Sequence, residues 1–372
     1  MKIYWSLLLC FAFLCVLSAC GGGGSGNVDR SISQPGVSNQ FVYVTNSSAN
    51  SVSAYQINTT TGVLSQLQGS PFPMSAGNSP RAAAVALGKY LYIANQSANT
   101  VTAYSVSATS GNITTINSYP TGNGPRSLVV AASGKFLYTA NFGSGNITAF
   151  AINSSTGELT PVTGSPFGAG ATFYSIASDA AGKFVYVTDN GFVRVYGFSI
   201  NATTGALTAV PGAFFAAGTD PLGIAVHPNG KFLYVTDVPG TAGNILVYSI
   251  DVNGALAPIT GSPFAVGSEP LAIAIEPGGK FAYVTLNGGP KIAQLSLDAT
   301  TGVPSAIGTP ALAMNPTELA IDPSGKYVYV TNPNLSNISG YLIGAFGTLT
   351  PLPFSPYTAG AGPSGIAILS TQ

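Results

Sequence analysis

Seven charged residues are the candidates for ligand chemistry in a sequence where only 6% of the positions carry a charge. Two of them are arginines that follow a proline, in Pro80-Arg81 and Pro125-Arg126. A guanidinium group can bind an anionic or carbonyl oxygen through paired hydrogen bonds. The other five carry carboxylates, which can bind hydroxyl groups or a cation. They are Asp189, Asp220, Asp237, Glu269 and Glu318.

These residues depart from a pattern that the rest of the chain repeats. Asp189 and Asp237 stand where other copies of the repeat have Asn, and Glu318 stands where the others have Ala, Ser or Gly. The departures favour a pocket for a polar ligand. Two alternatives stay open: the charges form local salt bridges, which are individually weak at a surface, or they simply face water. Calcium would suit the carboxylates, but no calcium-binding loop signature accompanies them.

The repeat is the short phrase aromatic-x-Tyr-β-branched-Thr/Ala-Asn/Asp, which occurs seven times, with only Leu286 departing from its last position. Its tyrosines are spaced by 49, 46, 48, 48, 49 and 46 residues, at Tyr43, Tyr92, Tyr138, Tyr186, Tyr234, Tyr283 and Tyr329. Each period contains four segments rich in β-branched and aromatic residues, separated by Gly, Pro and Asn turns. This length and texture predict one four-stranded propeller blade per repeat.

The two ends of the repeated region predict how the ring closes. The chain enters it with a second strand at 41–46 and leaves it with a first strand at 365–368. We therefore expect an all-β fold over residues 40–372, a seven-bladed β-propeller in which the C-terminal strand pairs with the N-terminal three strands. Closing the ring removes exposed strand edges, and we expect a monomer.

The phrase is intact at Tyr43-Val44-Thr45-Asn46 and at Tyr329-Val330-Thr331-Asn332. It resembles the YVTN β-propellers, a seven-bladed group that includes the propeller-type 6-phosphogluconolactonases and muconate-cyclising enzymes. The likeness covers residues 40–372, and its motifs are structural. It implies that ligands meet the face formed by the loops between second and third strands and between fourth and first strands, where the seven charged candidates fall.

The opposite face carries the turns between first and second strands. Six lysines occupy equivalent turn positions and are expected to keep the protein soluble: Lys89, Lys135, Lys183, Lys231, Lys280 and Lys326. The single histidine, His227, takes a turn position that holds Asp179, Glu276 or Asp322 in other repeats. We expect it to cap the turn backbone, because it lies on the wrong face for a general base.

Composition excludes several partners. The formal net charge is zero, with 12 basic and 12 acidic residues, so there is no electrostatic footprint for nucleic acid. All three cysteines lie within the first 20 residues, so the propeller has no disulfide and no thiolate metal site. No cofactor is implied.

The N-terminus has the pattern of an export signal. Lys2 precedes an apolar run over residues 3–17, and Leu17-Ser18-Ala19-Cys20 resembles the bacterial lipobox. We expect a signal peptide at 1–19 and, at 20–39, a lipidated Cys20 followed by a glycine-rich tether that holds the protein to a membrane. The alternative is an ordinary cleaved signal. Gly21 in place of Asp favours the outer membrane, if the organism has one.

Two functions compete on this sequence. The leading interpretation is a lipid-anchored binding or scaffold module of the cell envelope that takes a small polar ligand or an envelope protein. The alternative is a lactonase-like hydrolase or cyclase with its site at the channel mouth, where a base would activate water and donors would stabilise the oxyanion. A phosphorylated sugar lactone is a cytosolic metabolite, which argues against that particular substrate for an exported protein.

Overall fold

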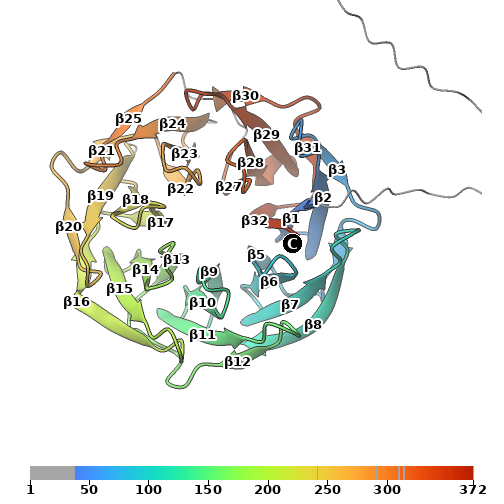
Figure 1. The fold of residues 1–372 in the computed structure, drawn as a ribbon, viewed down its shortest axis with the longest axis horizontal. Coiled ribbons are helices and arrows are strands. Elements are labelled where there is room, and N and C mark those ends of the chain that lie inside the picture. The colour runs from blue at the N-terminus through green and yellow to red at the C-terminus, as the bar shows by residue number, and fades with distance from the viewer. Residues whose placement is uncertain (1–37, 241, 290, 309–310, 313–314, 372) are drawn as a thin grey trace, which may run out of the picture. The chain divides into compact units, whose positions relative to one another are not determined.

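The computed structural model describes residues 38–371 except 241, 290, 309–310 and 313–314. Seven antiparallel sheets are arranged in a ring, each with its first strand innermost (Figure 1). The predicted all-β, seven-bladed propeller of four-stranded blades is therefore confirmed. The predicted signal peptide, Cys20 and most of the tether lie outside the described residues. In the part of the chain that is described, no helix has the length and apolar character needed to cross a membrane.

We number the blades from the N-terminus and give their strands from the centre outwards. Blade 1 holds β32 (Pro363–Ser370), β1 (Gln40–Asn46), β2 (Ser51–Ile57), β3 (Leu64–Gln66) and β4 (Phe72–Pro73). Blade 2 holds β5 (Pro80–Ala86), β6 (Tyr90–Asn95), β7 (Thr100–Val106) and β8 (Ile113–Pro120). Blade 3 holds β9 (Pro125–Val130), β10 (Phe136–Asn141), β11 (Asn146–Ile152) and β12 (Leu159–Pro161). Blade 4 holds β13 (Phe173–Ser178), β14 (Phe184–Asp189), β15 (Arg194–Ile200) and β16 (Leu207–Ala216).

The remaining blades follow the same plan. Blade 5 holds β17 (Pro221–Val226), β18 (Phe232–Asp237), β19 (Asn244–Ile250), β20 (Leu256–Pro258) and β21 (Phe264–Ala265). Blade 6 holds β22 (Pro270–Ile275), β23 (Phe281–Leu286), β24 (Lys291–Leu297), β25 (Pro304–Ala306) and β26 (Ala311–Leu312). Blade 7 holds β27 (Leu319–Ile321), β28 (Tyr327–Asn332), β29 (Asn337–Ile343), β30 (Leu349–Pro351), β31 (Tyr357–Thr358) and the 3-10 helix Pro333–Leu335.

The ring closes inside blade 1, as the two ends of the chain predict. Strand β1 pairs with β32 on one side, where Tyr43 lies opposite Ala367, and with β2 on the other, where Tyr43 lies opposite Ala54. The closing strand is longer than the predicted 365–368. The two ends of the propeller meet at Gln40 and Ser370.

The repeated tyrosine joins each blade to the next. Its buried hydroxyl donates a hydrogen bond to the carbonyl of a glycine in the next blade, in the turn between the third and fourth strands, as Tyr92 does to Gly157 at 2.9 Å. The remaining pairs are Tyr43 with Gly111, Tyr138 with Gly205, Tyr186 with Gly254, Tyr234 with Gly302, Tyr283 with Gly347 and Tyr329 with Gly62. Burial raises the pKa of these phenols, so they remain neutral donors.

The first aromatic residue of the phrase packs against the same glycine. At Gly62, which has a φ of +74°, an added Cβ would lie 2.4 Å from the ring of Tyr327. The glycine therefore serves both the left-handed turn and the close approach of the neighbouring ring. Because each blade buries its repeat residues against the next one, the repeat phrase specifies the contact between blades as well as the strand.

The face opposite the predicted ligand face carries tight turns between first and second strands. Asp322 holds one of them, because its Oδ1 accepts backbone N–H bonds from Lys326 and Tyr327, both at 2.7 Å. His227 does the same in blade 5: Nδ1 accepts the N–H of Asn229 at 3.1 Å, and Nε2 lies 2.8 Å from the carbonyl oxygen of Gly279. The expected capping role of His227 is thus observed. We call this side the turn face and the other side the mouth face.

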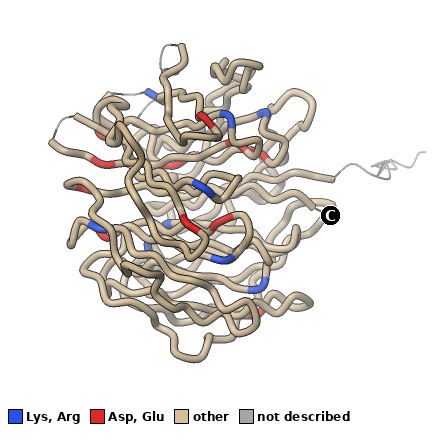
Figure 2. Tube along the Cα trace, turned by 60° about the vertical axis from the view of Figure 1, so that its left-hand side comes forward, with Lys and Arg blue, Asp and Glu red and all other residues tan. Residues whose placement is uncertain are grey.

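The few charges are spread over the fold. Figure 2 shows basic and acidic positions interspersed along the trace. Large hydrophobic side chains form seven clusters of buried residues, each between neighbouring blades. Apolar packing between blades therefore contributes much of the stability of the ring.

Candidate functional site

Six inner strands, together with Thr317 and Glu318 just before β27, line a cavity of about 210 Å³ with residues at three successive positions. The mouth layer, nearest the mouth face, consists of Arg81, Arg126, Tyr174, Leu222, Leu271, Thr317 and Ser364. The second layer consists of Ala82, Ser127, Ser175, Gly223, Ala272, Glu318 and Gly365. The third layer consists of Ala83, Leu128, Ile176, Ile224, Ile273, Leu319 and Ile366. All of them line the cavity except Leu222, Ser364 and Leu319.

Glu318 is the one large side chain of the second layer, since its equivalents are Ala, Ser or Gly. The small neighbours leave the space into which its carboxylate extends. The backbone of Glu318 is fixed by the buried Thr331, whose Oγ1 accepts the N–H of Glu318 at 3.1 Å and whose own N–H donates to the Glu318 carbonyl at 2.9 Å. The sequence thus places a single carboxylate below the mouth layer on a rigid support.

Local irregularities of the strands direct the mouth-layer side chains. The register between β5 and β6 shifts between Pro80 and Ala82, and the same shift occurs around Arg126 in blade 3. A residue at such a bulge leaves the regular alternation of the strand, and bulges often direct side chains into a site. In both blades the bulged residue is an arginine, and its side chain reaches the cavity.

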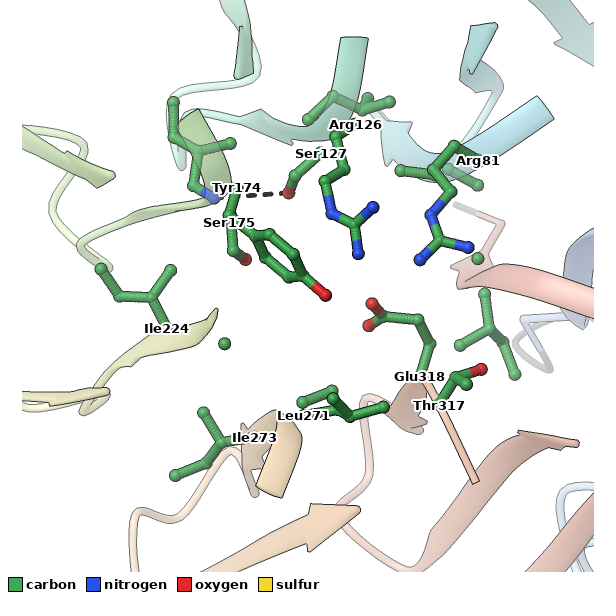
Figure 3. Close-up of a pocket in the computed structure, with 18 residues that line it drawn as sticks. Arg81, Arg126, Ser127, Tyr174, Ser175, Ile224, Leu271, Ile273, Thr317 and Glu318 are labelled. Carbon is green, nitrogen blue, oxygen red and sulfur yellow. Dashed lines mark hydrogen bonds between the residues drawn. The ribbon is translucent and has the colours of Figure 1, made fainter. Parts of the chain in front are cut away.

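Figure 3 shows how the four large polar side chains lie: Arg81, Arg126, the hydroxyl of Tyr174 and the carboxylate of Glu318 point toward one another across the cavity. They come from four different blades, which are blades 2, 3, 4 and 7. The guanidinium of Arg126 stacks over the ring of Tyr174 at 3.6 Å from its centroid, and the ring of Phe142 lies 5.7 Å away. This stacking orients Arg126 and leaves the edge of its guanidinium group for hydrogen bonds.

The electrostatics of the four groups are coupled. Burial raises the pKa of the Glu318 carboxyl above its ordinary value of 4.5, and the charges of Arg81 and Arg126 oppose this rise. Burial also lowers the pKa of Arg126, and the nearby Arg81 acts in the same direction. Two like charges beside one partly desolvated carboxylate create a site of positive potential, which suits an anionic ligand or a developing oxyanion.

Three of the seven predicted site residues, Arg81, Arg126 and Glu318, come together at this cavity. Asp189 and Asp237 lie on the mouth face, but their carboxylates are buried in loops. Asp189 accepts backbone N–H bonds from Ala171 at 2.9 Å and from Thr172 at 3.0 Å. Asp237 accepts two more, both at 2.7 Å, from Thr219 and Asp220. Each carboxylate thus holds the loop that leads into an inner strand.

The other two acidic candidates also lie outside the cavity lining. Asp220 accepts a hydrogen bond from Asn190 of the preceding blade, and burial raises the pKa of its carboxyl. Glu269 accepts one from Asn287 at 3.2 Å. Both acids thus bind loops of the mouth face to one another through asparagine amides.

Tyr174 is the site residue that the sequence interpretation missed. It occupies the same position of its inner strand as Arg81 and Arg126. An aromatic residue with a polar end at a position held twice by arginine was the available signal. The neighbouring Ser127 is engaged in structure, since its Oγ accepts the N–H of Ile176 at 3.3 Å across two blades (Figure 3).

The described residues contain no group of three or more His, Cys, Asp or Glu that could hold a metal ion. The polar groups that line the cavity include two guanidinium groups, one phenol and one carboxylate, together with the hydroxyls of Ser175 and Thr317. These groups can bind a carboxylate or carbonyl oxygen and can transfer a proton at Glu318.

Comparison with known proteins places this fold and cavity in a family. The family model for the lactonase with a seven-bladed β-propeller matches residues 33–174 and 169–361. The chain belongs to the seven-bladed β-propeller lactonase family. No curated protein sequence matches it.

Solved structures resemble this lactonase-family chain over nearly its whole length. A Bacteroides fragilis protein provisionally described as a 6-phosphogluconolactonase superposes with a TM-score of 0.75 at 23% identity, covering 90% of this chain and 99% of its own. The periplasmic gluconolactonase PpgL of Pseudomonas aeruginosa gives a TM-score of 0.74 at 18% identity, with coverages of 90% and 100%. At these identities the likeness shows the fold, and the family membership favours the lactonase alternative over the binding or scaffold interpretation.

Proposed function

We propose that this protein is a lactonase-type hydrolase whose active site is the cavity at the mouth face. The observation that carries the proposal is the meeting of Arg81, Arg126, Tyr174 and Glu318 around one cavity (Figure 3). Family membership supports it, and so does the pairing of a proton-accepting group with cationic donors, which ester-ring hydrolysis requires. Arg81 and Arg126 bind the carbonyl oxygen of the lactone, and Glu318 faces the water that attacks.

The reaction is a balanced addition of water. Glu318 takes a proton as the water oxygen bonds to the carbonyl carbon, and the negative charge that develops on the carbonyl oxygen lies against the two guanidinium groups. The ring C–O bond then breaks, and the ring oxygen receives the proton back from Glu318. Because burial raises the pKa of the Glu318 carboxyl, its ionised form is a stronger base than an exposed carboxylate.

The test is to incubate the full chain with a panel of small lactones and to measure hydrolysis by the acid that is released. Glu318→Gln should lower kcat by about 100-fold or more, the range for loss of a general base. The matched control is Glu269→Gln, since Glu269 is an acid of the same face outside the cavity. Equal losses in the two variants, or no hydrolysis of any lactone by the parent chain, would overturn the proposal.

The arginines have a matched control of their own. Arg81→Ala combined with Arg126→Ala should abolish turnover, whereas Arg194→Ala should preserve it. Arg194 lies in β15, where its guanidinium stacks on Phe214 at 4.0 Å, and it does not line the cavity. An unchanged kcat/KM in the double variant would contradict the role given to the guanidinium pair.

A binding module without catalysis is the second candidate. The guanidinium groups of Arg81 and Arg126 would bind the carboxylate of an organic acid without any reaction. The lining of the cavity has one carboxylate for proton transfer, so catalysis depends on Glu318 alone, whereas binding does not. Acid binding with no hydrolysis of any lactone would favour this function, which agrees with the leading interpretation of the sequence.

We also propose that the protein works outside the cytoplasm, held to a membrane by lipid on Cys20. The support is the Leu17-Ser18-Ala19-Cys20 motif and the glycine-rich stretch behind it. Cys20→Ala should move the protein from the membrane pellet to the soluble fraction. An unchanged pellet would count against the anchor and would leave the hydrolase proposal intact.

A further inference from the structure

The two sides of the cavity differ in chemistry. The polar side chains Arg81, Arg126, Tyr174 and Glu318 all come from blades 2, 3, 4 and 7. Blades 5 and 6 contribute Gly223, Ile224, Leu271, Ala272 and Ile273, whose side chains have no hydrogen-bonding atoms. Figure 3 shows Ile224, Leu271 and Ile273 along the side of the cavity away from the arginines. We call these five residues the apolar wall.

Three backbone groups behind the apolar wall are also hydrogen-bonded within the protein. The N–H of Gly223 donates to Thr236 Oγ1 at 2.7 Å, and the carbonyl of Leu271 accepts from the same hydroxyl at 2.9 Å. The N–H of Ala272 donates to Thr285 Oγ1 at 2.9 Å. A ligand lying against this wall therefore meets methyl and methylene groups, and these three backbone groups already have partners.

The third layer continues the apolar wall around the bottom of the cavity. Its members that line the cavity are Ala83, Leu128, Ile176, Ile224, Ile273 and Ile366. A bound molecule thus has hydrogen-bonding partners at one side and aliphatic carbon on the opposite side and below. A substrate that matches this arrangement has a polar ester or acid group at one end and a hydrocarbon portion at the other.

We infer that the substrate is an aliphatic lactone, with an alkyl ring or alkyl substituent against the apolar wall, and not a polyhydroxylated sugar lactone. The inference rests on the proposed lactonase function and names the substrate class of that site. A sugar lactone carries hydroxyl groups around its whole ring. Each hydroxyl that faces the wall loses water without gaining a partner, which weakens binding by about tenfold or more.

Two lactones of equal carbon number give a direct test. The δ-lactone of 5-hydroxyhexanoic acid and glucono-δ-lactone both have six carbons and a six-membered ring, and they differ in their hydroxyl groups. With the full chain, we expect kcat/KM for the alkyl lactone to exceed that for the sugar lactone by about 100-fold, the product of two unpaired hydroxyls. Equal or faster hydrolysis of the sugar lactone would overturn the inference while supporting the hydrolase itself.

A change in the apolar wall tests the cause of the preference. Leu271→Gln places an amide on the apolar wall. It should lower the ratio of kcat/KM for the alkyl lactone to kcat/KM for the sugar lactone by tenfold or more, whereas Leu271→Met should leave this ratio unchanged. Leu335→Gln is the control, since Leu335 is 47% exposed and does not line the cavity. A melting temperature for each variant checks that it folds. A ratio that is the same in Leu271→Gln and Leu335→Gln would contradict the role of the wall.

Binding of two related six-carbon acids keeps the inference testable if neither lactone is hydrolysed. Hexanoate and gluconate are six-carbon monoacids that differ only in hydroxyl groups, and calorimetry gives Kd for each with the full chain. Hexanoate binding at least tenfold tighter would support the aliphatic class even where the hydrolase proposal had failed. Tighter or equal binding of gluconate, or no binding of hexanoate, would overturn it.

Discussion

The phenolic hydroxyl of Tyr329 donates a 2.7 Å hydrogen bond to the carbonyl oxygen of Gly62, which lies 267 residues earlier in the chain. It is the same bond that joins every other pair of neighbouring blades, made here between the last complete repeat and the blade that contains both ends of the propeller. The contact that closes the ring, between blades 7 and 1, is therefore made by the same tyrosine-to-glycine hydrogen bond as the other six contacts between blades.

Tyr329→Phe should lower the free energy of unfolding by about 1–3 kcal/mol, because it leaves the buried Gly62 carbonyl without its donor. The control is Tyr119→Phe on the largely solvent-facing strand β8, which should change stability by less than about 0.5 kcal/mol. Denaturant unfolding measures both. Equal effects would show that the bond between blades contributes nothing specific.

Gly62→Ala should destabilise the protein by more than Gly230→Ala. Both glycines have a positive φ, of +74° and +72°, so both variants carry the backbone strain of a left-handed alanine. Only at Gly62 does the new Cβ meet an aromatic ring, that of Tyr327, whereas nothing lies within 4 Å at Gly230. The expected difference is about 1–3 kcal/mol, since the ring must move out of a packed interface. Indistinguishable melting temperatures would contradict this account.

Deletion of the residues after Gly362 should cost far more stability than the loss of ten residues elsewhere. It removes β32, the inner strand of blade 1, and exposes one edge of β1 together with the apolar surface that Leu369 and Ile366 cover. We expect a large drop in melting temperature or failure to fold. A truncated protein that melts where the parent does would refute the closure.

Glu318→Gln should stabilise the protein at neutral pH and have no effect in acid. An acid whose pKa is raised by folding holds its proton more tightly in the folded state, so its favourable contribution is full below about pH 4.5 and is lost as the pH rises through the raised pKa. Glutamine removes that dependence. We expect a gain of roughly 2 °C at pH 8 that vanishes near pH 4, measured by thermal melting across pH. A gain in melting temperature that is the same at every pH would contradict a raised pKa of Glu318 in the folded protein.

The fold followed closely from the sequence because the repeat phrase encodes local structure and the contact between blades together. The site followed only in part. Position in the repeat places Asp189 and Arg126 on the same face, but it does not distinguish a carboxylate that binds the N–H groups of a neighbouring loop, as Asp189 does, from a side chain that reaches the cavity, as Arg126 does. The strand irregularity at Arg126 recurs at the same position in other blades, including at Ser364, which does not line the cavity, so the direction of a side chain depends on the partners that surround it.

Tyr174 shows the complementary difficulty. Tyrosine is common throughout this sequence, so the signal at Tyr174, a polar aromatic residue at a position held twice by arginine, is weak. Glu318 is easier to find, since a large acid among Ala, Ser and Gly stands out in any alignment of the repeats. Contrast with the repeat marks Glu318 correctly but also marks Asp189 and Asp237, which do not line the cavity.

Strand β1 lies between β2 and β32, with seven registered pairs on each side. Its hydrogen bonds run perpendicular to the strand direction, so a force applied along the strand from residues 38–39 loads both ladders in shear and does not open their bonds one at a time. A pull on the N-terminal segment is thereby shared between both flanking strands of the closing blade. The point where the chain leaves the ring is thus mechanically strong, as an attachment to any surface requires.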